Sequence, residues 1–208
     1  MLFFLLFSII AIIILIESIY LLDSLRLLRR WALPDFMKNN NTRRLILLSL
    51  MVAYSLALYI LETFIPNPLM LLFPGAKLGL SNIITLICLL TFGFRDTFFI
   101  LSVRILLSSM FAGPASTLLF SIAGGYLSLL GMYLVSRIPG FSIIGISLAG
   151  AVLHNIGQLL MAALIINNIS IITYLPFMLF ASIVTGVFIG IVVKFALRSK
   201  YFKNMKLE

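Results

Sequence analysis

Residues 115–136 read ASTLLFSIAGGYLSLLGMYLVS, an uninterrupted run without a charged side chain. The hydrocarbon layer of a bilayer is about 30 Å thick, and a helix needs about 20 residues to cross it. Apolar side chains surround this run on all sides, which is typical of a helix in lipid rather than of a helix with one buried face. Turn-forming residues bound the run, with Gly113-Pro114 before it and Pro139-Gly140 after it.

The whole chain of 208 residues has the same character, with 62% hydrophobic and only 10% charged residues. A soluble domain carries about 25% charged residues. This composition excludes a soluble enzyme, a disordered chain and, despite the formal net charge of +9, a nucleic-acid partner. It predicts an integral membrane protein whose main contact is the lipid bilayer.

Six further apolar stretches predict the rest of the fold, and none alternates polar and apolar residues as a transmembrane strand would. They lie at approximately 2–22, 45–65, 79–93, 97–112, 142–166 and 171–195. We therefore predict an all-α integral membrane protein with a six-helix bundle. Because 79–93 and 97–112 are short for full spans, we expect tilt or shielding by neighbouring helices.

The predicted organisation has four parts. They are an N-terminal transmembrane anchor at 1–22, a cytoplasmic linker at 23–44, the six-helix membrane core at 45–197 and a basic cytoplasmic tail at 198–208. A signal peptide is the alternative for 2–22, but this stretch lacks a basic n-region and an A-x-A-like cleavage site. We therefore favour the anchor.

The positions of the basic residues predict the orientation. If every stretch crosses the membrane, 13 of the 15 Lys and Arg residues fall on one side, Lys77 falls on the other and Arg104 lies within a span. Cytoplasmic loops carry the excess of Lys and Arg. We expect a multi-pass protein of the bacterial cell (inner or plasma) membrane, with the N-terminus outside and the C-terminus in the cytoplasm.

Polar side chains within or beside the spans are candidates for ligand binding, because an ionisable group in hydrocarbon is costly. His154 and Gln158 share one helix face by their i, i+4 spacing. The candidate residues are Glu62, Lys77, Asn82, Arg104, His154, Asn155 and Gln158. One interpretation is structural, with these groups bonded to one another. The other is a cavity open to the outside, where two cations and the free N–H groups of a helix start near 79–82 bind an anion.

The sequence offers no catalytic or metal-binding constellation. Cys88 is the only cysteine and His154 the only histidine, so a Cys/His pair for catalysis or a multi-cysteine metal site is not expected. The six acidic residues are scattered without the paired carboxylates that would hold magnesium for diphosphate chemistry. We expect neither a cofactor, nor a metal, nor catalysis by this chain alone.

Small residues recur at four-residue spacing in several stretches, as they do where membrane helices approach closely. For the glycines and alanines of 115–136, 142–166 and 171–195 we expect packing within the bundle. Ser49, Ala53 and Ala57 share one face of the stretch 45–65, where a partner helix could dock instead.

Three segments then resemble a known family. PGAKLGLSN at 74–82, SIAGG at 121–125 and HNIGQ at 154–158 resemble the Gx transporter family, also labelled heptaprenyl diphosphate synthase component I. The resemblance covers approximately residues 43–197. It implies similarity to the substrate-binding (S) components of energy-coupling-factor transporters, six-helix proteins that capture a small molecule from outside.

The resemblance also implies partners. S components dock on a transmembrane coupling subunit driven by two ATPases through an A-x-x-x-A pattern, which Ala53 and Ala57 match. Members of the family are also associated with a flavin- and quinone-linked extracellular electron-transfer system. We expect a membrane substrate-binding or transport component for a small, anionic or isoprenoid- or flavin-related molecule. The alternatives are a non-catalytic membrane subunit of a prenyl-diphosphate or quinone pathway and a membrane anchor of an electron-transfer assembly.

Overall fold

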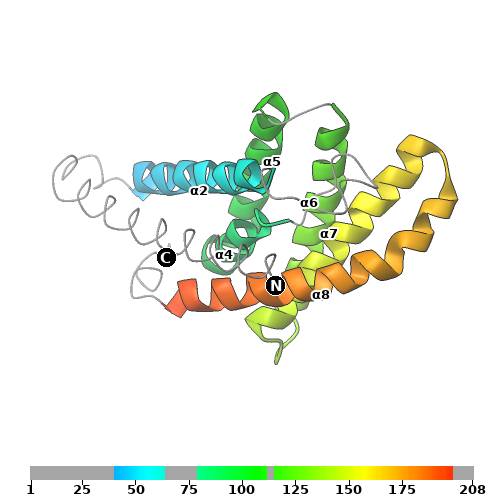
Figure 1. Ribbon diagram of the computed structural model, residues 1–208. Coiled ribbons are helices and arrows are strands. Elements are labelled where there is room, and N and C mark those ends of the chain that lie inside the picture. Colours follow the sequence, from blue (N-terminus) through cyan, green and yellow to red (C-terminus); the bar gives the residue numbers. More distant parts are fainter. Residues whose placement is uncertain (1–39, 64–78, 112–114, 199–208) are drawn as a thin grey trace.

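The computed structural model describes residues 40–63, 79–111 and 115–198, and these residues are helical almost throughout (Figure 1). The elements in chain order are α2 (Asn40–Thr63), α4 (Asn82–Phe92), α5 (Phe94–Phe111), α6 (Ala115–Ser136), α7 (Ile143–Ile166), the 3-10 segment η2 (Ile169–Tyr174) and α8 (Leu175–Arg198). The predicted anchor at 1–22, the linker before residue 40, Lys77 and the tail beyond Arg198 lie outside the described residues.

The described helices have the length and composition of membrane spans. Four segments are long and apolar enough to cross a bilayer, namely Arg44–Glu62, Thr117–Ser136, Ile143–Ile166 and Ile169–Arg198. Large apolar side chains on their outer surfaces are exposed, among them Leu164, Phe177 and Phe180. Such a surface is stable against lipid tails and not against water. The prediction of an all-α integral membrane protein is confirmed.

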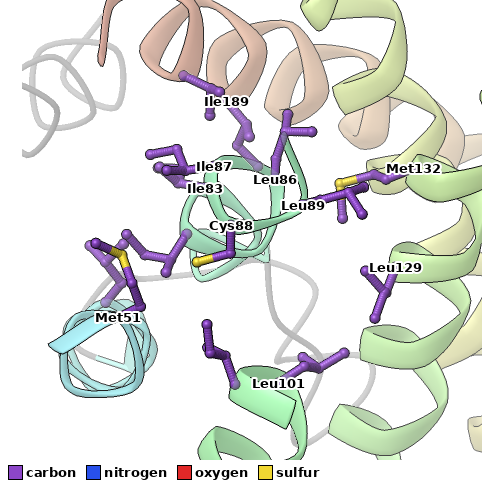
Figure 2. Packing of buried hydrophobic residues seen from close by; sticks show 14 of the residues in the cluster. Met51, Ile83, Leu86, Ile87, Cys88, Leu89, Leu101, Leu129, Met132 and Ile189 are labelled. Atoms are coloured by element: carbon purple, nitrogen blue, oxygen red, sulfur yellow. The ribbon is translucent and has the colours of Figure 1, made fainter. Parts of the chain in front are cut away.

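The short helix α4 occupies the centre of the described bundle. Its 11 residues rise about 16 Å, roughly half of the hydrocarbon layer. Every residue from Asn82 to Leu89 is buried. Figure 2 shows Leu86, Cys88 and Leu89 of α4 surrounded by side chains of α2, α5, α6 and α8. The expectation that neighbouring helices shield the stretch 79–93 is therefore confirmed.

Helices α6, α7 and α8 pack through glycines, as the small-residue pattern predicts. These three helices make the most extensive contacts between elements. A methyl group on Gly157 of α7 would lie 2.6 Å from the carbonyl oxygen of Ala123, and one on Gly190 of α8 would lie 2.7 Å from Cα of Ile144. Because both neighbours are backbone atoms, only glycine allows these helices to come so close.

The last predicted stretch, 171–195, begins differently from a plain helix. Residues Ile169–Tyr174 form the 3-10 segment η2, and the α-helix starts only at Leu175. The side chain of Asn168 accepts a hydrogen bond from the N–H of Ser170, which fixes the turn. Pro176 has no N–H to donate, and the first turn of a helix is where its absence costs least.

Candidate functional site

Glu62, near the end of α2, binds the backbone at the start of α4. Its buried carboxylate accepts hydrogen bonds from the N–H of Gly79 at 2.6 Å and from the N–H of Leu80 at 3.0 Å. A carboxylate is favoured at a helix N-terminus, and here it satisfies N–H groups of irregular backbone that lipid could not. The prediction that free N–H groups near 79–82 await an anionic ligand is wrong for Gly79 and Leu80, because the chain supplies its own anion.

Arg104 of α5 reaches the same segment from another direction. Its Nη1 donates to the hydroxyl of Ser81 at 3.1 Å, and its Cζ lies 5.5 Å from the ring centre of Tyr59. The side chain is only 2% exposed, and its Nε has no hydrogen-bond partner. A guanidinium remains charged when buried and requires several acceptors. Arg104 therefore retains hydrogen-bonding capacity that the described residues do not use.

Asn82, the first residue of α4, lies next to Gly79 and His154. Gly79 has φ = 84°, in the left-handed region that glycine adopts without strain, and a methyl group there would lie 3.0 Å from Asn82 Nδ2 and 3.2 Å from His154 Nε2. Neither Oδ1 nor Nδ2 of Asn82 has a hydrogen-bond partner, although the residue is only 3% exposed. Three polar atoms on Asn82 and Arg104 are thus buried without partners.

His154 and Gln158 close this region from α7. Their side chains meet at 3.1 Å between the two Nε2 atoms, as the i, i+4 spacing predicts. Gly124 of α6 packs against both, since a methyl group there would lie 2.9 Å from His154 Nδ1 and 3.0 Å from Gln158 Cγ. We call Glu62, Asn82, Arg104, His154 and Gln158 the polar cluster.

The structure separates Asn155 from its predicted companions. Its Nδ2 donates to the carbonyl oxygen of Met178 at 3.1 Å and to the hydroxyl of Ser182 at 2.7 Å, both on α8. Asn155 therefore links α7 to α8 and does not join the polar cluster. The predicted entrance residue, Lys77, lies outside the described residues.

Sequence reasoning missed two residues beside the polar cluster. Ser81 binds Arg104, and Tyr59 lies under the guanidinium while its hydroxyl lies 3.2 Å from that of Ser121. Tyr59 precedes Glu62 by three positions on α2, so helical spacing alone puts both on one face. That spacing was the signal available for Tyr59, whereas the contact of Ser81 depends on the arrangement of α4 and α5.

The predicted docking face on α2 is open to the surroundings. Ser49, Ala53 and Ala57 are all exposed, and Leu45 and Leu61 extend the same i, i+4 series at either end. The hydroxyl of Ser49 donates to the carbonyl oxygen of Leu45, so the polar group is satisfied within the helix. Within the described part of the chain, no other element buries the side chains of this face.

Metal ligands are not assembled in the described ranges. No group of three or more His, Cys, Asp or Glu residues comes together there. Cys88 of α4 is buried in the apolar core of the described bundle (Figure 2). The polar cluster instead combines amide, imidazole and guanidinium groups, which suit hydrogen bonding to a polar molecule.

These features define a multi-pass helical membrane protein with a buried polar cluster around the start of its central helix. The model of the family described as heptaprenyl diphosphate synthase component I matches residues 51–196, and the chain belongs to that family. The family resemblance expected from the sequence is thereby confirmed. Comparisons with curated proteins and with solved structures gave no match.

Proposed function

We propose that the chain is a membrane substrate-binding component, similar to the S component of an energy-coupling-factor transporter, with the polar cluster as its ligand site. The observation that carries this proposal is the buried Asn82 amide, whose Oδ1 and Nδ2 both lack partners. The preceding residue, Ser81, binds Arg104, whose Nε is also without a partner. Leaving a buried polar group unsatisfied costs about 1–3 kcal/mol. A ligand that accepts from Arg104 and bonds both atoms of Asn82 would remove that cost.

The hydrogen-bond donors of the cluster favour an anionic ligand, although the anion would not bind to the N–H groups of Gly79 and Leu80 as the sequence suggested. Glu62 holds the backbone of Gly79 and Leu80, so the guanidinium of Arg104 is the cation left to meet a ligand. Asn82 and Gln158 supply amides that bond to carbonyl, hydroxyl or phosphate oxygens. A small carboxylate or phosphate, or the polar end of an isoprenoid- or flavin-related molecule, has the matching chemistry.

We propose that the ligand arrives from outside. Arg44, Arg95 and Arg137 come from three different parts of the chain and line one hollow, so they lie at the same end of the bundle. The positive-inside rule puts that end in the cytoplasm. Arg104 follows Arg95 by nine residues on α5, a rise of about 14 Å towards the other side. Lys77 would then stand at the outer entrance.

This orientation has a direct test. Phe141, in the connection between α6 and α7, and Ile169, at the start of η2, are both exposed at opposite ends of α7. In intact cells an impermeant thiol reagent should label the variant Ile169→Cys and not Phe141→Cys, and the buried Cys88 gives little background. Labelling of Phe141→Cys alone would reverse the orientation.

The face formed by Ser49, Ala53 and Ala57 is the proposed contact with a coupling subunit that works with ATPases. Small residues let the backbones of two membrane helices approach, so that dispersion and Cα–H contacts accumulate. The exposure of this face on α2 leaves it available to such a helix.

A second candidate function rests on the family description. A component of a heptaprenyl diphosphate synthase could act as a non-catalytic membrane subunit of a prenyl-diphosphate or quinone pathway. In the described ranges the two carboxylates are Glu62 and Asp96, and each binds a group of this chain, so neither is arranged to hold magnesium. A membrane anchor of an extracellular electron-transfer system is the remaining alternative.

The experiment that separates these functions is mass spectrometry of small molecules that copurify with the detergent-solubilised protein. The wild type should retain a small anionic compound at a near-stoichiometric ratio. Arg104→Gln should lose it, and Arg104→Lys, which keeps the charge but not the fork, should retain part of it. Arg198→Gln removes the same charge at the exposed end of α8 and serves as the control. Equal retention by wild type and Arg104→Gln would contradict the proposal.

A further inference from the structure

A hollow of about 370 Å³ lies at the end of the bundle away from the polar cluster, among α2, α4, α5 and α6. Its polar lining is formed by Arg44, Arg95, Asp96 and Arg137. Its apolar lining consists of aromatic rings, namely those of Phe92, Phe94 and Tyr133. Aromatic and basic side chains together are typical of the level at which a membrane protein meets lipid head groups.

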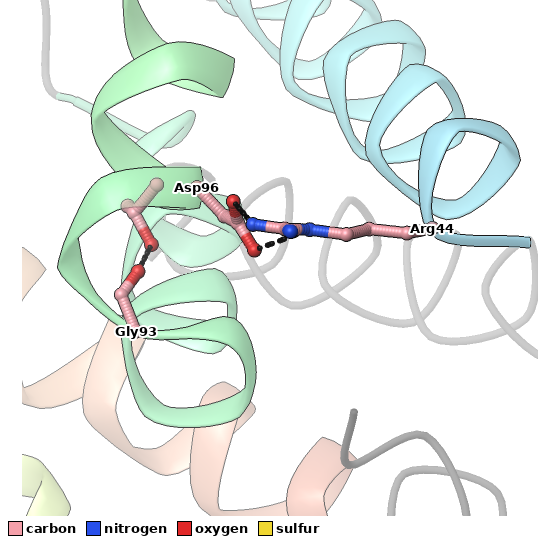
Figure 3. Close-up of polar contacts among 4 residues, drawn as sticks. Arg44, Gly93 and Asp96 are labelled. Carbon is pink, nitrogen blue, oxygen red and sulfur yellow. Dashed lines mark hydrogen bonds and ion pairs between the residues drawn. The ribbon is translucent and has the colours of Figure 1, made fainter. Parts of the chain in front are cut away.

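The hollow carries more positive than negative charge. Arg44 directs Nη2 and Nε to the two carboxylate oxygens of Asp96, at 2.5 and 3.3 Å (Figure 3). The other carboxylate of the described ranges, Glu62, binds the start of α4. Within the described part of the chain, Arg95 and Arg137 therefore have no carboxylate partner, and the lining has an excess of two positive charges.

Arg137 is held in place by Tyr133, one turn before it. Its Nη2 donates to the tyrosine hydroxyl at 3.0 Å, and its Cζ lies 4.9 Å from the ring centre. The one hydrogen bond, to Tyr133, leaves the other N–H groups of this exposed guanidinium available. A planar guanidinium fixed in this way is suited to two-pronged binding of a phosphate group.

An aromatic track leads from the hollow along the seam between α5 and α6. The ring of Tyr133 lies 4.6 Å from that of Phe94, Phe94 lies 6.2 Å from Phe98, and Phe98 stacks on Tyr126 at 5.3 Å, all between ring centres. Phe98 is 46% exposed. On α6, exposed Leu130 lies between the two tyrosines in sequence, and exposed Leu134 directly follows Tyr133. The track offers an apolar surface that begins at the charged hollow.

We propose that the hollow binds the phosphate group of a phosphate-headed lipid, with the apolar chain of that lipid lying along the aromatic track. The two uncompensated arginines match a head group of one or two negative charges. We expect the ligand to carry an apolar chain because such a chain can contact Phe98 and its neighbours, whereas free phosphate makes no contact with them. The shared chemistry fits an anionic phospholipid of the surrounding leaflet and a polyprenyl diphosphate.

Native mass spectrometry of the full chain in detergent tests this site. The test ligands are dioleoyl phosphatidylglycerol and farnesyl diphosphate, and inorganic diphosphate is the ligand without a chain. The controls without net charge are dioleoyl phosphatidylcholine and farnesol, respectively. At least one of the first two should bind at least about tenfold more tightly than its uncharged or zwitterionic counterpart, because each arginine near the membrane contributes about 1 kcal/mol. The tighter of the two identifies the source of the head group.

Matched variants locate the binding. Arg95→Gln with Arg137→Gln should weaken it about tenfold or more, whereas Lys194→Gln with Arg198→Gln removes the same charge from exposed positions on α8 and should leave it unchanged. Phe98→Ala should weaken the chain-bearing ligand and not inorganic diphosphate. Arg137→Lys, the milder change, should weaken binding several-fold if the double variant fails to fold.

Three results would overturn the inference. They are equal binding by the wild type and the arginine variants, equal weakening by the α8 control, and inorganic diphosphate binding as tightly as the lipids. Arg104→Gln changes the polar cluster only, so it should leave lipid binding intact. Failure of this site and failure of the ligand site proposed above are thus distinguishable.

Discussion

Asn82 and Asn155 are buried to the same extent, 3% exposed each, and yet they are bonded very differently. Asn155 donates two hydrogen bonds to α8, while Asn82 makes none with either of its polar atoms. Both belong to the same membrane-embedded bundle, so the cost of burying an amide is similar. Asn155 therefore joins two helices through its Nδ2, although its Oδ1 has no partner, and our proposal assigns Asn82 to the ligand.

The largest expected effect concerns the carboxylate beside Asn82. Glu62→Ala should lower the free energy of unfolding by about 3 kcal/mol or more, because two backbone N–H groups lose their partner and Arg104 loses a nearby counter-charge. Glu62→Gln keeps one accepting oxygen and should cost less. The midpoint of thermal unfolding in detergent measures both. A midpoint unchanged in Glu62→Ala would show that the start of α4 does not depend on this contact.

A pair of glycines beside the cluster gives the next largest effect. Gly157→Ala would bring a methyl group to 2.6 Å from the Ala123 carbonyl oxygen, so the helices must separate, at a cost of about 1–3 kcal/mol. In Gly124→Ala the nearest atoms to the new methyl group belong to the side chains of His154 and Gln158, not to backbone. This change should be less destabilising and should reduce ligand retention. Equal destabilisation by the two changes would show that the side chains of the cluster are as fixed as the backbone.

The two asparagines themselves provide the sharpest comparison. Asn155→Leu should destabilise the protein by about 1 kcal/mol, since it removes two hydrogen bonds between α7 and α8. Asn82→Leu removes none and should leave the unfolding midpoint unchanged or raise it, while ligand retention is lost. Thermal unfolding and copurification measure these opposite effects. Loss of stability in Asn82→Leu equal to that in Asn155→Leu would assign Asn82 a structural role.

Much of the fold was predictable because lipid imposes a simple rule on composition. The stretch 115–136 matches α6 (Ala115–Ser136) residue for residue, since turn-forming residues end the apolar run on both sides. The start of α8 was not predictable in the same way. Residues 171–174 are as apolar as the helix that follows, and their 3-10 conformation depends on the turn at Asn168.

The polar cluster was predictable in its members and not in its bonds. The free-energy cost of a polar side chain in hydrocarbon was enough to select these residues from the sequence. They are Glu62, Asn82, Arg104, His154 and Gln158. The partner of Glu62 is backbone 17 and 18 residues away, and the partner of Arg104 is a serine 23 residues away. No residue type marks a backbone N–H as the partner of a carboxylate. Asn155, one position from His154, was grouped with the cluster because sequence proximity hides the direction in which a side chain points.

The smallest effect on stability is expected on the exposed face of α2 that carries Ala53 and Ala57. The exposed surface of α8 serves as the comparison. Ala53→Leu with Ala57→Leu should change the unfolding midpoint by no more than about 2 °C, because exposed positions usually shift stability by less than about 0.5 kcal/mol. The same bulk would hold a partner helix away by several ångström and remove the close contacts that small residues allow.

Recovery of a coupling subunit and its ATPases with the tagged protein from native membranes should therefore fall sharply. The control is Val184→Phe with Val187→Phe, which enlarges two exposed residues on α8. If α2 is a docking face and α8 a lipid-facing one, only the alanine variant loses its partners. Equal recovery with both double variants would show that the α2 face contacts lipid and does not bind a partner. The proposal of a coupling subunit would then lose the docking face on which it rests.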